Sequence, residues 1–268
     1  RPEEGLLRMR KELGLFANIR PTYTFESLLE KSPIKKSIIQ GTDLVFVREL
    51  TGGIYFGKRG RNNAKDYAFD TCEYNVDEIK RLAKVGFELA MKRSKKLCCI
   101  DKANVLETSR LWRQTVQSLE KNYPEVSVSY EFVDAVAMRL IHSPSYYDVL
   151  ITSNLFGDIL TDEASVISGS MGLMPSASVG TRTSIYEPIH GSFPQAKGKN
   201  IANPLATILS ASMMFERSFN LLDESKLIRD LVNDSIVNNI VTEDLSASGK
   251  SYGTNEIGDW IKEKIERG

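Results

Sequence analysis

Apolar runs of strand length alternate with helical patterns over the first two thirds of the chain. There are four such runs, each short and apolar, as is typical of buried strands. They cover residues 43–48, 96–100, 126–132 and 148–152. Apolar positions with helical spacing lie between them, over residues 76–93 and 109–121 and again after Asp134. Because this alternation is typical of α/β proteins, we predict an α/β fold.

Other segments depart from the alternation. Residues 51–67 are rich in Gly, Arg and Asn, which predicts an extended arm or loop. Residues 169–191 combine several glycines with small polar residues, and we predict a segment rich in loops there. Helices are expected in the remainder of the chain. They cover residues 203–219, 223–239 and 253–266, the first with Asn203 as its N-cap and Pro204 at its first position.

The charge balance and the length narrow the class of protein. The 268 residues carry 35 Lys and Arg against 35 Asp and Glu, so no net positive field exists to hold a polyanion. No apolar run reaches the roughly 18 residues of a membrane-spanning helix. We therefore expect neither a nucleic-acid partner nor a membrane partner. The length allows one large domain or two modest ones.

The three cysteines form neither a metal-binding spacing nor an even disulfide set. Cys98 and Cys99 are adjacent in an apolar run, and on a strand they would point to opposite faces of the sheet. We interpret Cys72, Cys98 and Cys99 as buried thiols of a protein in the reducing cytoplasm.

A pair of aspartates follows the apolar run 148–152. Asp158 and Asp162 are four residues apart, which places them on one face of a helix that begins near Asn154. They could be solvated acids at a helix start, where the helix dipole favours them. They could also be oxygen ligands of a hard divalent cation, with Asp134, which also follows a strand run, as a third carboxylate.

Three arginines form a second candidate group. Arg10 lies near the end of an amphipathic helical segment and Arg20 follows that segment. Arg48 is the last residue of the strand run 43–48. The planar guanidinium is suited to carboxylates, so three of them together would suit a dicarboxylate or tricarboxylate substrate. Each arginine by itself could equally form a surface ion pair.

Two further side chains could move protons. Tyr55 follows a pair of glycines, and a tyrosine there could protonate an enolate or carbanion. Lys102 lies just beyond the run 96–100 and could act as a base if burial or neighbouring cations lower its pKa. The alternatives are a packed arm tyrosine and an ordinary lysine at a strand end.

The segment from Glu187 through His190 to Asn203 is a glycine-containing loop that enters a helix. Backbone N–H groups at such a position can bind phosphates. No G-x-G-x-x-G follows a strand run, so the sequence gives no support to a Rossmann dinucleotide site.

Five segments together resemble the β-decarboxylating dehydrogenases, the family of isocitrate and isopropylmalate dehydrogenases. They are VRELTGGIYFG, DKANVLE, NLFGDILTDEAS, GSMGLMPSAS and EPIHGS followed by IANP. The resemblance covers essentially the whole chain, in family order. It implies a two-domain, non-Rossmann α/β fold with an extended arm at a homodimer interface. Residues 1–15 and 169–268 would form the cofactor-binding domain, and residues 16–168 the substrate, metal and dimerisation domain.

The resemblance also implies roles for individual residues. Arginines 10, 20 and 48 would hold the malate carboxylates, and Tyr55 and Lys102 would form the catalytic pair. Asp158 and Asp162 would bind Mg²⁺ or Mn²⁺ with Asp134 from a second copy, and Lys102 would also reach across the dimer. The residues implied to bind NAD are Glu187, His190, Gly191, Gln195 and Asn203, with Asn104 of the second copy nearby.

The start of the chain bears on the substrate. Glu3, Leu6 and Leu7 precede Arg10 on one helical face, as in family members that use isopropylmalate, and Val105 would complete the apolar pocket. Leucines there would leave the extra carboxylate of isocitrate unpaired in apolar surroundings. The resemblance thus implies NAD-dependent oxidative decarboxylation of 3-isopropylmalate to 4-methyl-2-oxopentanoate, in leucine biosynthesis. Alternatives are isocitrate, homoisocitrate or tartrate as substrate, or a non-catalytic regulatory subunit.

Two features depart from the family pattern. Gln195 stands where the family has an aspartate that accepts the adenosine ribose hydroxyls, but an amide can still bond to those hydroxyls. We keep NAD as the expected cofactor, although Lys197 and Lys199 are close in sequence. The family's N-terminal strand and glycine-rich turn have no counterpart in these residues. We therefore expect an incomplete first domain and no stable activity of the 268 residues alone.

Overall fold

The computed structural model describes residues 2–246 and 249–267, apart from the side chains of residues 2 and 3. The chain forms two compact units. Unit 1 consists of Arg1–Ile19, Asp43–Glu163 and Ser178–Ser184, and unit 2 consists of Arg20–Thr42, Ala164–Ala177 and Ile185–Gly268. The expected division into a cofactor-binding and a substrate domain is functional, and it stays a prediction.

Within the described residues, seven strands form a sheet in the order β6-β5-β7-β2-β1-β8-β9. The bounds are β1 Ala17–Tyr23, β2 Asp43–Glu49, β5 Lys96–Asp101, β6 Ser127–Phe132, β7 Val149–Thr152, β8 Pro175–Val179 and β9 Ser184–Pro188. In unit 1, β6, β5, β7 and β2 run parallel, with Arg48 of β2 in register with Thr152 of β7. The carboxyl ends of β2 and β7 therefore lie side by side.

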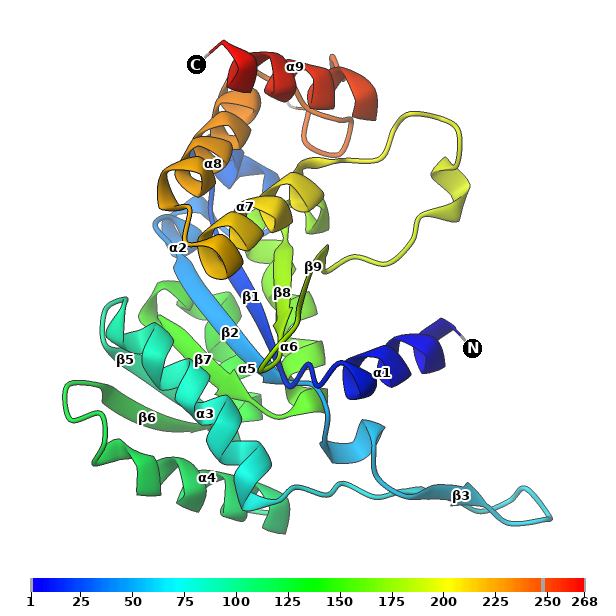
Figure 1. Ribbon diagram of the computed structural model, residues 1–268, viewed down its shortest axis with the longest axis vertical. Coiled ribbons are helices and arrows are strands. Elements are labelled where there is room, and N and C mark those ends of the chain that lie inside the picture. Colours follow the sequence, from blue (N-terminus) through cyan, green and yellow to red (C-terminus); the bar gives the residue numbers. More distant parts are fainter. Residues whose placement is uncertain (1, 247–248, 268) are drawn as a thin grey trace. The chain divides into compact units, whose positions relative to one another are not determined.

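Helices cover the parallel strands of unit 1. These helices are α3 (Val76–Met91), α4 (Glu107–Glu120), α5 (Val133–His142) and α6 (Asn154–Ser168). Helix α3 packs on β7 and β2, and α4 packs on β5 beside α3 (Figure 1). Asn75 and Glu78 form a capping box that starts α3, and the apolar face that includes Leu82 and Phe87 is fully buried. The predicted α/β fold is thus confirmed.

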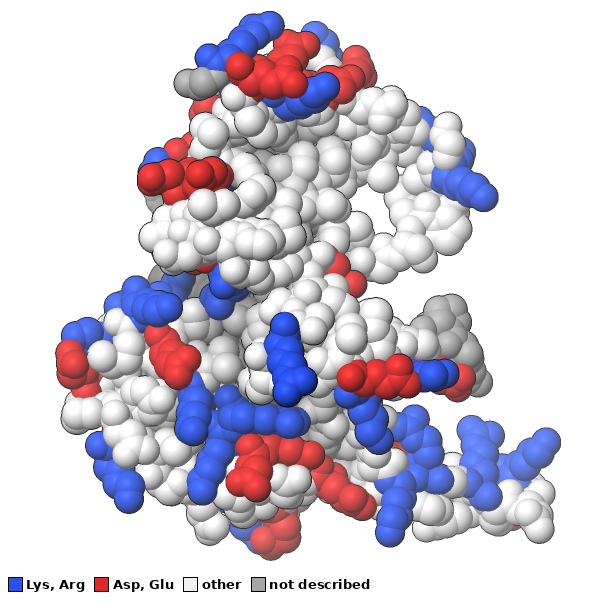
Figure 2. Space-filling model, viewed as in Figure 1, with Lys and Arg blue, Asp and Glu red and all other residues white. Residues whose placement is uncertain are grey.

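The predicted arm is a hairpin of β3 (Arg59–Arg61) and β4 (Ala68–Asp70) that projects from unit 1 (Figure 1). It follows a single 3-10 turn, Gly53–Tyr55. Lysine and arginine side chains gather along it (Figure 2). Its exposed aromatic rings, Tyr67 and Phe69, lie 6.2 Å apart by centroid. The hairpin has few apolar neighbours within this chain to hold it.

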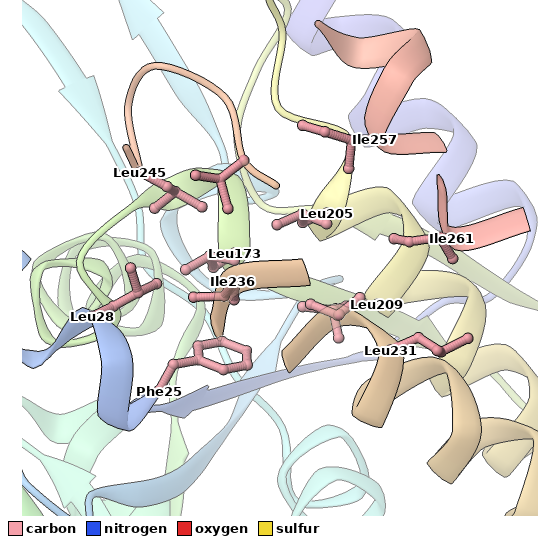
Figure 3. Packing of buried hydrophobic residues seen from close by; sticks show 12 residues of the cluster. Phe25, Leu28, Leu173, Leu205, Leu209, Leu231, Ile236, Leu245, Ile257 and Ile261 are labelled. Carbon is pink, nitrogen blue, oxygen red and sulfur yellow. The ribbon is translucent and has the colours of Figure 1, made fainter. Parts of the chain in front are cut away.

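Unit 2 has its own apolar core. Helices α7 (Leu205–Phe219), α8 (Leu222–Val237) and α9 (Thr254–Glu266) enclose it (Figure 3). The buried side chains include Phe25, Leu173, Leu209 and Ile257, from segments far apart in the sequence. The short helix α2 (Lys36–Ile39) also belongs to this unit, whereas α1 (Pro2–Glu12) belongs to unit 1. None of the described helices is long and apolar enough to cross a membrane.

Some expectations need correction. The strands β1, β8 and β9 were not predicted, and β8 and β9 lie within the segment 169–191 that was expected to be rich in loops. These strands carry Ser, Pro, Asn, Arg and Glu in place of a continuous apolar run, so their pattern gives no strand signal. Cys98 and Cys99 are buried on β5 as expected, but Cys72 is exposed.

Candidate active site

The candidate site in unit 1 begins where β2 ends and α6 begins. Arg48 lies at the end of β2 and Asn154 is the first residue of α6. The side chain of Arg48 is almost fully buried, so its guanidinium must find partners within the protein. Nε donates to the backbone oxygen of Asn154 at 2.9 Å, Nη2 donates to Asn154 Oδ1 at 2.9 Å, and Nη1 binds Asp158 Oδ1. Asn154 and Asp158 at the start of α6 therefore hold all three nitrogens.

Tyr55 joins the same carboxylate. Its hydroxyl donates to Asp158 Oδ2 at 2.7 Å, and the Arg48 guanidinium carbon lies 5.9 Å from the centre of its ring. Partial burial and then the hydrogen bond to Asp158 raise the pKa of Tyr55 to about 12, while Arg48 and Arg10 act in the opposite direction. The phenol consequently keeps its proton at neutral pH.

The turn that carries Tyr55 is held by buried hydrogen bonds. The Glu49 side chain is fully buried, and its carboxylate accepts bonds from Thr51 N at 2.8 Å, Thr51 Oγ1 at 2.8 Å and Gly52 N at 2.7 Å. Burial raises the pKa of Glu49, and these bonds and Arg81 act against that rise. Gly53 has a φ of 72° and thus needs to be glycine.

Asp162 lies one turn beyond Asp158 on α6, as the spacing predicted. Asp134 lies in the first turn of α5 and forms an ion pair with Lys102, which follows β5. The hydrogen bond from Lys102 lowers the pKa of Asp134. The Lys102 ammonium lies 5.6 Å from the centre of the Phe132 ring, and its backbone N–H donates to Ser109 Oγ. In this chain, Lys102 and Asp134 therefore neutralise each other.

The donor set fits part of a divalent-cation site. Carboxylate oxygens are the ligands that Mg²⁺ and Mn²⁺ prefer, and Asp158 and Asp162 supply two such groups on one helical face. Among the residues that the structure describes, no three His, Cys, Asp or Glu side chains form a group that could hold a metal.

The remaining predicted substrate residues of unit 1 lie on α1 and after β5. Arg10 is buried in the last turn of α1, and Leu6 and Leu7 on the preceding turn are half-buried. Val105 and Asn104 are exposed in the segment after β5. The side chain of Glu3 lies outside the described part of the chain. Arg20 is buried on β1, at the edge of unit 2.

The predicted cofactor residues lie in unit 2. Glu187 is on β9, His190 and Gly191 follow it, and Gln195 is exposed in a short 3-10 turn. His190 Nδ1 lies 3.0 Å from the Gly191 oxygen. These residues form a partly exposed segment that leads to α7, and its polar groups could bind a dinucleotide.

The N-terminus of α7 differs from the prediction by two residues. The helix begins at Leu205, and Asn203 Oδ1 accepts a bond from the Leu205 N–H at 3.0 Å. Asn203 Nδ2 donates to Asp244 Oδ2 at 3.1 Å. Pro204 holds the N-cap position, so the predicted N-cap at Asn203 is wrong by one residue, although the Asn203 side chain does bind the N–H of the first helical residue.

Sequence reasoning assigned no role to Glu49, Tyr74 or Asn154, although these residues organise the site. Tyr74 Oη accepts the Asn154 N–H at 2.9 Å, and Asn154 Nδ2 donates to the Gly52 oxygen at 3.0 Å. For Asn154, the available signal was an amide two residues after the apolar run 148–152, where a polar side chain can satisfy buried groups.

Comparisons with known proteins identify the family of the chain. The isocitrate/isopropylmalate dehydrogenase family matches residues 1–261. The chain belongs to this family. A 3-isopropylmalate dehydrogenase of Bacteroides fragilis is 55% identical over 268 residues, which is 100% of this chain and 75% of the relative. One from Aquifex aeolicus is 49% identical over 271 residues, 100% of this chain and 74% of that relative.

Solved structures give the same result for the fold. An isocitrate dehydrogenase from Methylococcus capsulatus is 33% identical, with a TM-score of 0.89 over 97% of this chain and 76% of that one. A β-decarboxylating dehydrogenase from Thermococcus kodakarensis is 32% identical, with a TM-score of 0.80 over 98% of this chain and 72% of that one. The expected isocitrate/isopropylmalate dehydrogenase fold is confirmed.

Proposed function

We propose that the chain oxidatively decarboxylates 3-isopropylmalate to 4-methyl-2-oxopentanoate with NAD, in cytoplasmic leucine biosynthesis. The observation that carries the proposal is the cluster in which Asp158 binds both a buried arginine and a protonated tyrosine. This cluster lies in a chain whose relatives of 49 to 55% identity are named 3-isopropylmalate dehydrogenase. It joins a proton donor, a carboxylate and a guanidinium in one place.

The substrate would meet positive charge and apolar surface together. The buried Arg48 and Arg10 would hold carboxylates, since a guanidinium in low-dielectric surroundings binds them strongly. Arg48 has five N–H groups, and its three contacts to α6 leave two of them for a ligand. We propose Arg20 as the third arginine, with Glu3, Leu6, Leu7 and Val105 around the isopropyl group.

We propose that Asp158 and Asp162 hold Mg²⁺ or Mn²⁺ together with Asp134 of a second copy. Bound there, the cation would supply positive charge to the hydroxyl and carboxylate oxygens and to the enolate left when carbon dioxide departs. The pairing of Asp134 with Lys102 within one chain supports a shared site. Both side chains would be carried as a unit to the partner's Asp158.

Tyr55 and Lys102 would move the protons. Tyr55 is protonated at neutral pH, so it can donate to the enol carbon after decarboxylation. Lys102 of the second copy would accept the hydroxyl proton as its neutral amine, since an ammonium has no lone pair to accept one, while the hydride leaves for the nicotinamide. That hydride chemistry belongs to NAD, which we place on Glu187, His190, Gly191, Gln195 and Asn203, with Asn104 of the second copy.

Steady-state kinetics of the full-length homodimer test the substrate and the cofactor. We expect turnover of 3-isopropylmalate with NAD and Mg²⁺, a lower kcat/KM with NADP, and slower turnover of isocitrate, homoisocitrate and tartrate. Faster turnover of isocitrate would contradict the leucine pocket. A preference for NADP would show that Gln195 with Lys197 and Lys199 selects the phosphate. Binding without any turnover would favour a regulatory subunit.

The metal assignment has its own test. In Asp158→Asn, the amide has one acceptor oxygen, so Arg48 can keep a partner while the cation loses its charged ligand. We expect calorimetry to show loss of Mn²⁺ binding and the assay to show loss of metal-dependent turnover. Circular dichroism should remain that of the parent enzyme. Retained Mg²⁺-dependent activity would refute the assignment.

A further inference from the structure

We propose that Asn154 is a positioning residue of the active site. It fixes the Arg48 guanidinium and the turn that carries Tyr55 against the first turn of α6. The inference rests on the proposed function. It adds a residue that contacts neither the substrate nor the cofactor in that scheme. Asn154 is fully buried, so its polar groups cannot use water.

Four hydrogen bonds meet at this residue. Its backbone oxygen and Oδ1 each accept from Arg48 at 2.9 Å. Its Nδ2 donates to the Gly52 oxygen at 3.0 Å, and its N–H donates to Tyr74 Oη at 2.9 Å. The partners belong to β2, to the turn after β2 and to the segment before α3. The side chain thus joins β2 and the turn after it to the start of α6, and the backbone N–H adds the segment before α3.

The position requires an amide. One side-chain atom has to accept a hydrogen bond from Arg48, and the other has to donate to the carbonyl of Gly52. Aspartate presents two acceptors, so it would face the Gly52 oxygen with no proton between them. Alanine would leave a guanidinium N–H and a buried carbonyl without a partner. Among short side chains, asparagine meets both requirements.

Because Asn154 and Asp158 lie on the same helix, the contacts of Asn154 also set the positions of Asp158 and Tyr55. Asp158 lies four residues after Asn154, on the same face of α6. Arg48 therefore binds Asn154 through Nη2 and Asp158 through Nη1, which sets the carboxylate relative to β2. The Gly52 carbonyl, fixed by Asn154, stands three residues before Tyr55. The Asn154 amide therefore positions both partners of the Tyr55–Asp158 hydrogen bond.

The residues of the turn are held to one another and to Tyr74 by close packing. A Cβ on Gly52 would lie 2.9 Å from Tyr74 Cε1, and one on Gly53 would lie 2.2 Å from Tyr74 Oη. The Glu49 carboxylate binds the turn from its other side. Without Asn154 Nδ2, the turn should therefore move as a block and carry Tyr55 with it. Displacements of about 1 Å at a reacting group can lower a rate on the order of 100-fold.

The test uses the full-length enzyme with Asn154→Ala and Asn154→Asp, beside Thr115→Val as the matched control. Thr115 is a buried residue of α4 whose hydroxyl donates only within its own helix, to Leu111. We expect both Asn154 variants to lower kcat about 10- to 100-fold at saturating ligands, with KM for NAD unchanged. Thr115→Val should have a lower melting temperature than the parent enzyme but the same kcat.

A kcat within threefold of the parent for a folded Asn154 variant would overturn the proposal. The proposal would also be overturned if kcat fell only in proportion to the fall in melting temperature, because a purely structural role would give that result. Crystal structures of the variants give a readout that needs no activity. We expect the Tyr55–Asp158 contact to be broken or lengthened, and an unchanged contact would overturn the proposal even if the enzyme used another substrate. If Asn154→Ala fails to fold, Asn154→Asp carries both measurements.

Discussion

Tyr55 donates its hydroxyl proton to Oδ2 of Asp158 at 2.7 Å, while Arg48 binds the other oxygen of that carboxylate. The bond places a protonated acid directly on a predicted metal ligand. The group that would bind the metal for decarboxylation and the group that would protonate the product are therefore neighbours. The same bond explains why the pKa of Tyr55 is raised, because ionisation would place two negative charges side by side.

Tyr55→Phe removes only the hydroxyl. If Tyr55 is the proton donor, we expect kcat to fall on the order of 100- to 10,000-fold with KM for 3-isopropylmalate changed little. Tyr67→Phe is the control, because Tyr67 lies exposed on the hairpin. Since the raised pKa keeps the phenol protonated, kcat of the parent should not fall through this group below about pH 10. A Tyr55→Phe kcat within threefold of the parent would exclude the role.

Gly157→Ala tests how closely α6 packs on Arg48. The new Cβ would lie 2.6 Å from Arg48 Cγ and 2.8 Å from Thr152 Cγ2, so the helix or the arginine has to move. We expect a loss of about 1–3 kcal/mol in the free energy of unfolding, measured by urea titration, and a lower kcat.

Gly258→Ala provides the comparison for that substitution. A Cβ at Gly258 in α9 meets nothing within 4 Å. Helix propensity alone should then stabilise the protein by about 0.5–1 kcal/mol, with kcat unchanged. Equal effects of the two substitutions would show that the contact with Arg48 is not tight.

Mixed dimers test whether the site is shared between copies. Lys102→Ala and Asp158→Asn chains are each expected to be inactive alone, but a mixed dimer has one site with both intact residues. After joint unfolding and refolding, activity should reach on the order of a quarter of the parent, because about half of the dimers are mixed. A chain with both substitutions, mixed with Lys102→Ala, is the control and should stay inactive. Lack of recovery would place Lys102 and Asp158 in the same chain's site.

Thiol labelling tests the burial of the cysteines. Cys98 and Cys99 are buried on β5, and burial raises the pKa of Cys98 to about 12, so neither should react in the native protein. Cys72 is exposed and should react slowly, because its pKa is also raised by its surroundings. We expect one labelled thiol by mass spectrometry before unfolding, three after it, and none in native Cys72→Ser. Early labelling of Cys98 would contradict the buried strand.

Much of the fold was predictable where local pattern is strong. The strands β2, β5, β6 and β7 and the helices α3, α4, α7, α8 and α9 lie within a few residues of the expected ranges. Their signal is strong because both faces of a parallel strand and one face of each helix must be apolar. Strands β1, β8 and β9 were missed because they have mixed polar sequences. Their hydrogen-bonded neighbours make them strands, and the neighbours are far away in sequence.

The sequence by itself determined the family, the α/β class and the set of residues that carry the chemistry, because motifs and periodicity are local properties of the chain. The tertiary structure alone decided which of these residues meet. Arg48 and Asp158 are separated by 110 positions, and no local pattern states that they share a hydrogen bond. Tertiary structure also revealed Asn154 as the residue that joins them. A buried amide gains its role from the groups around it, and these groups come together only when the chain folds.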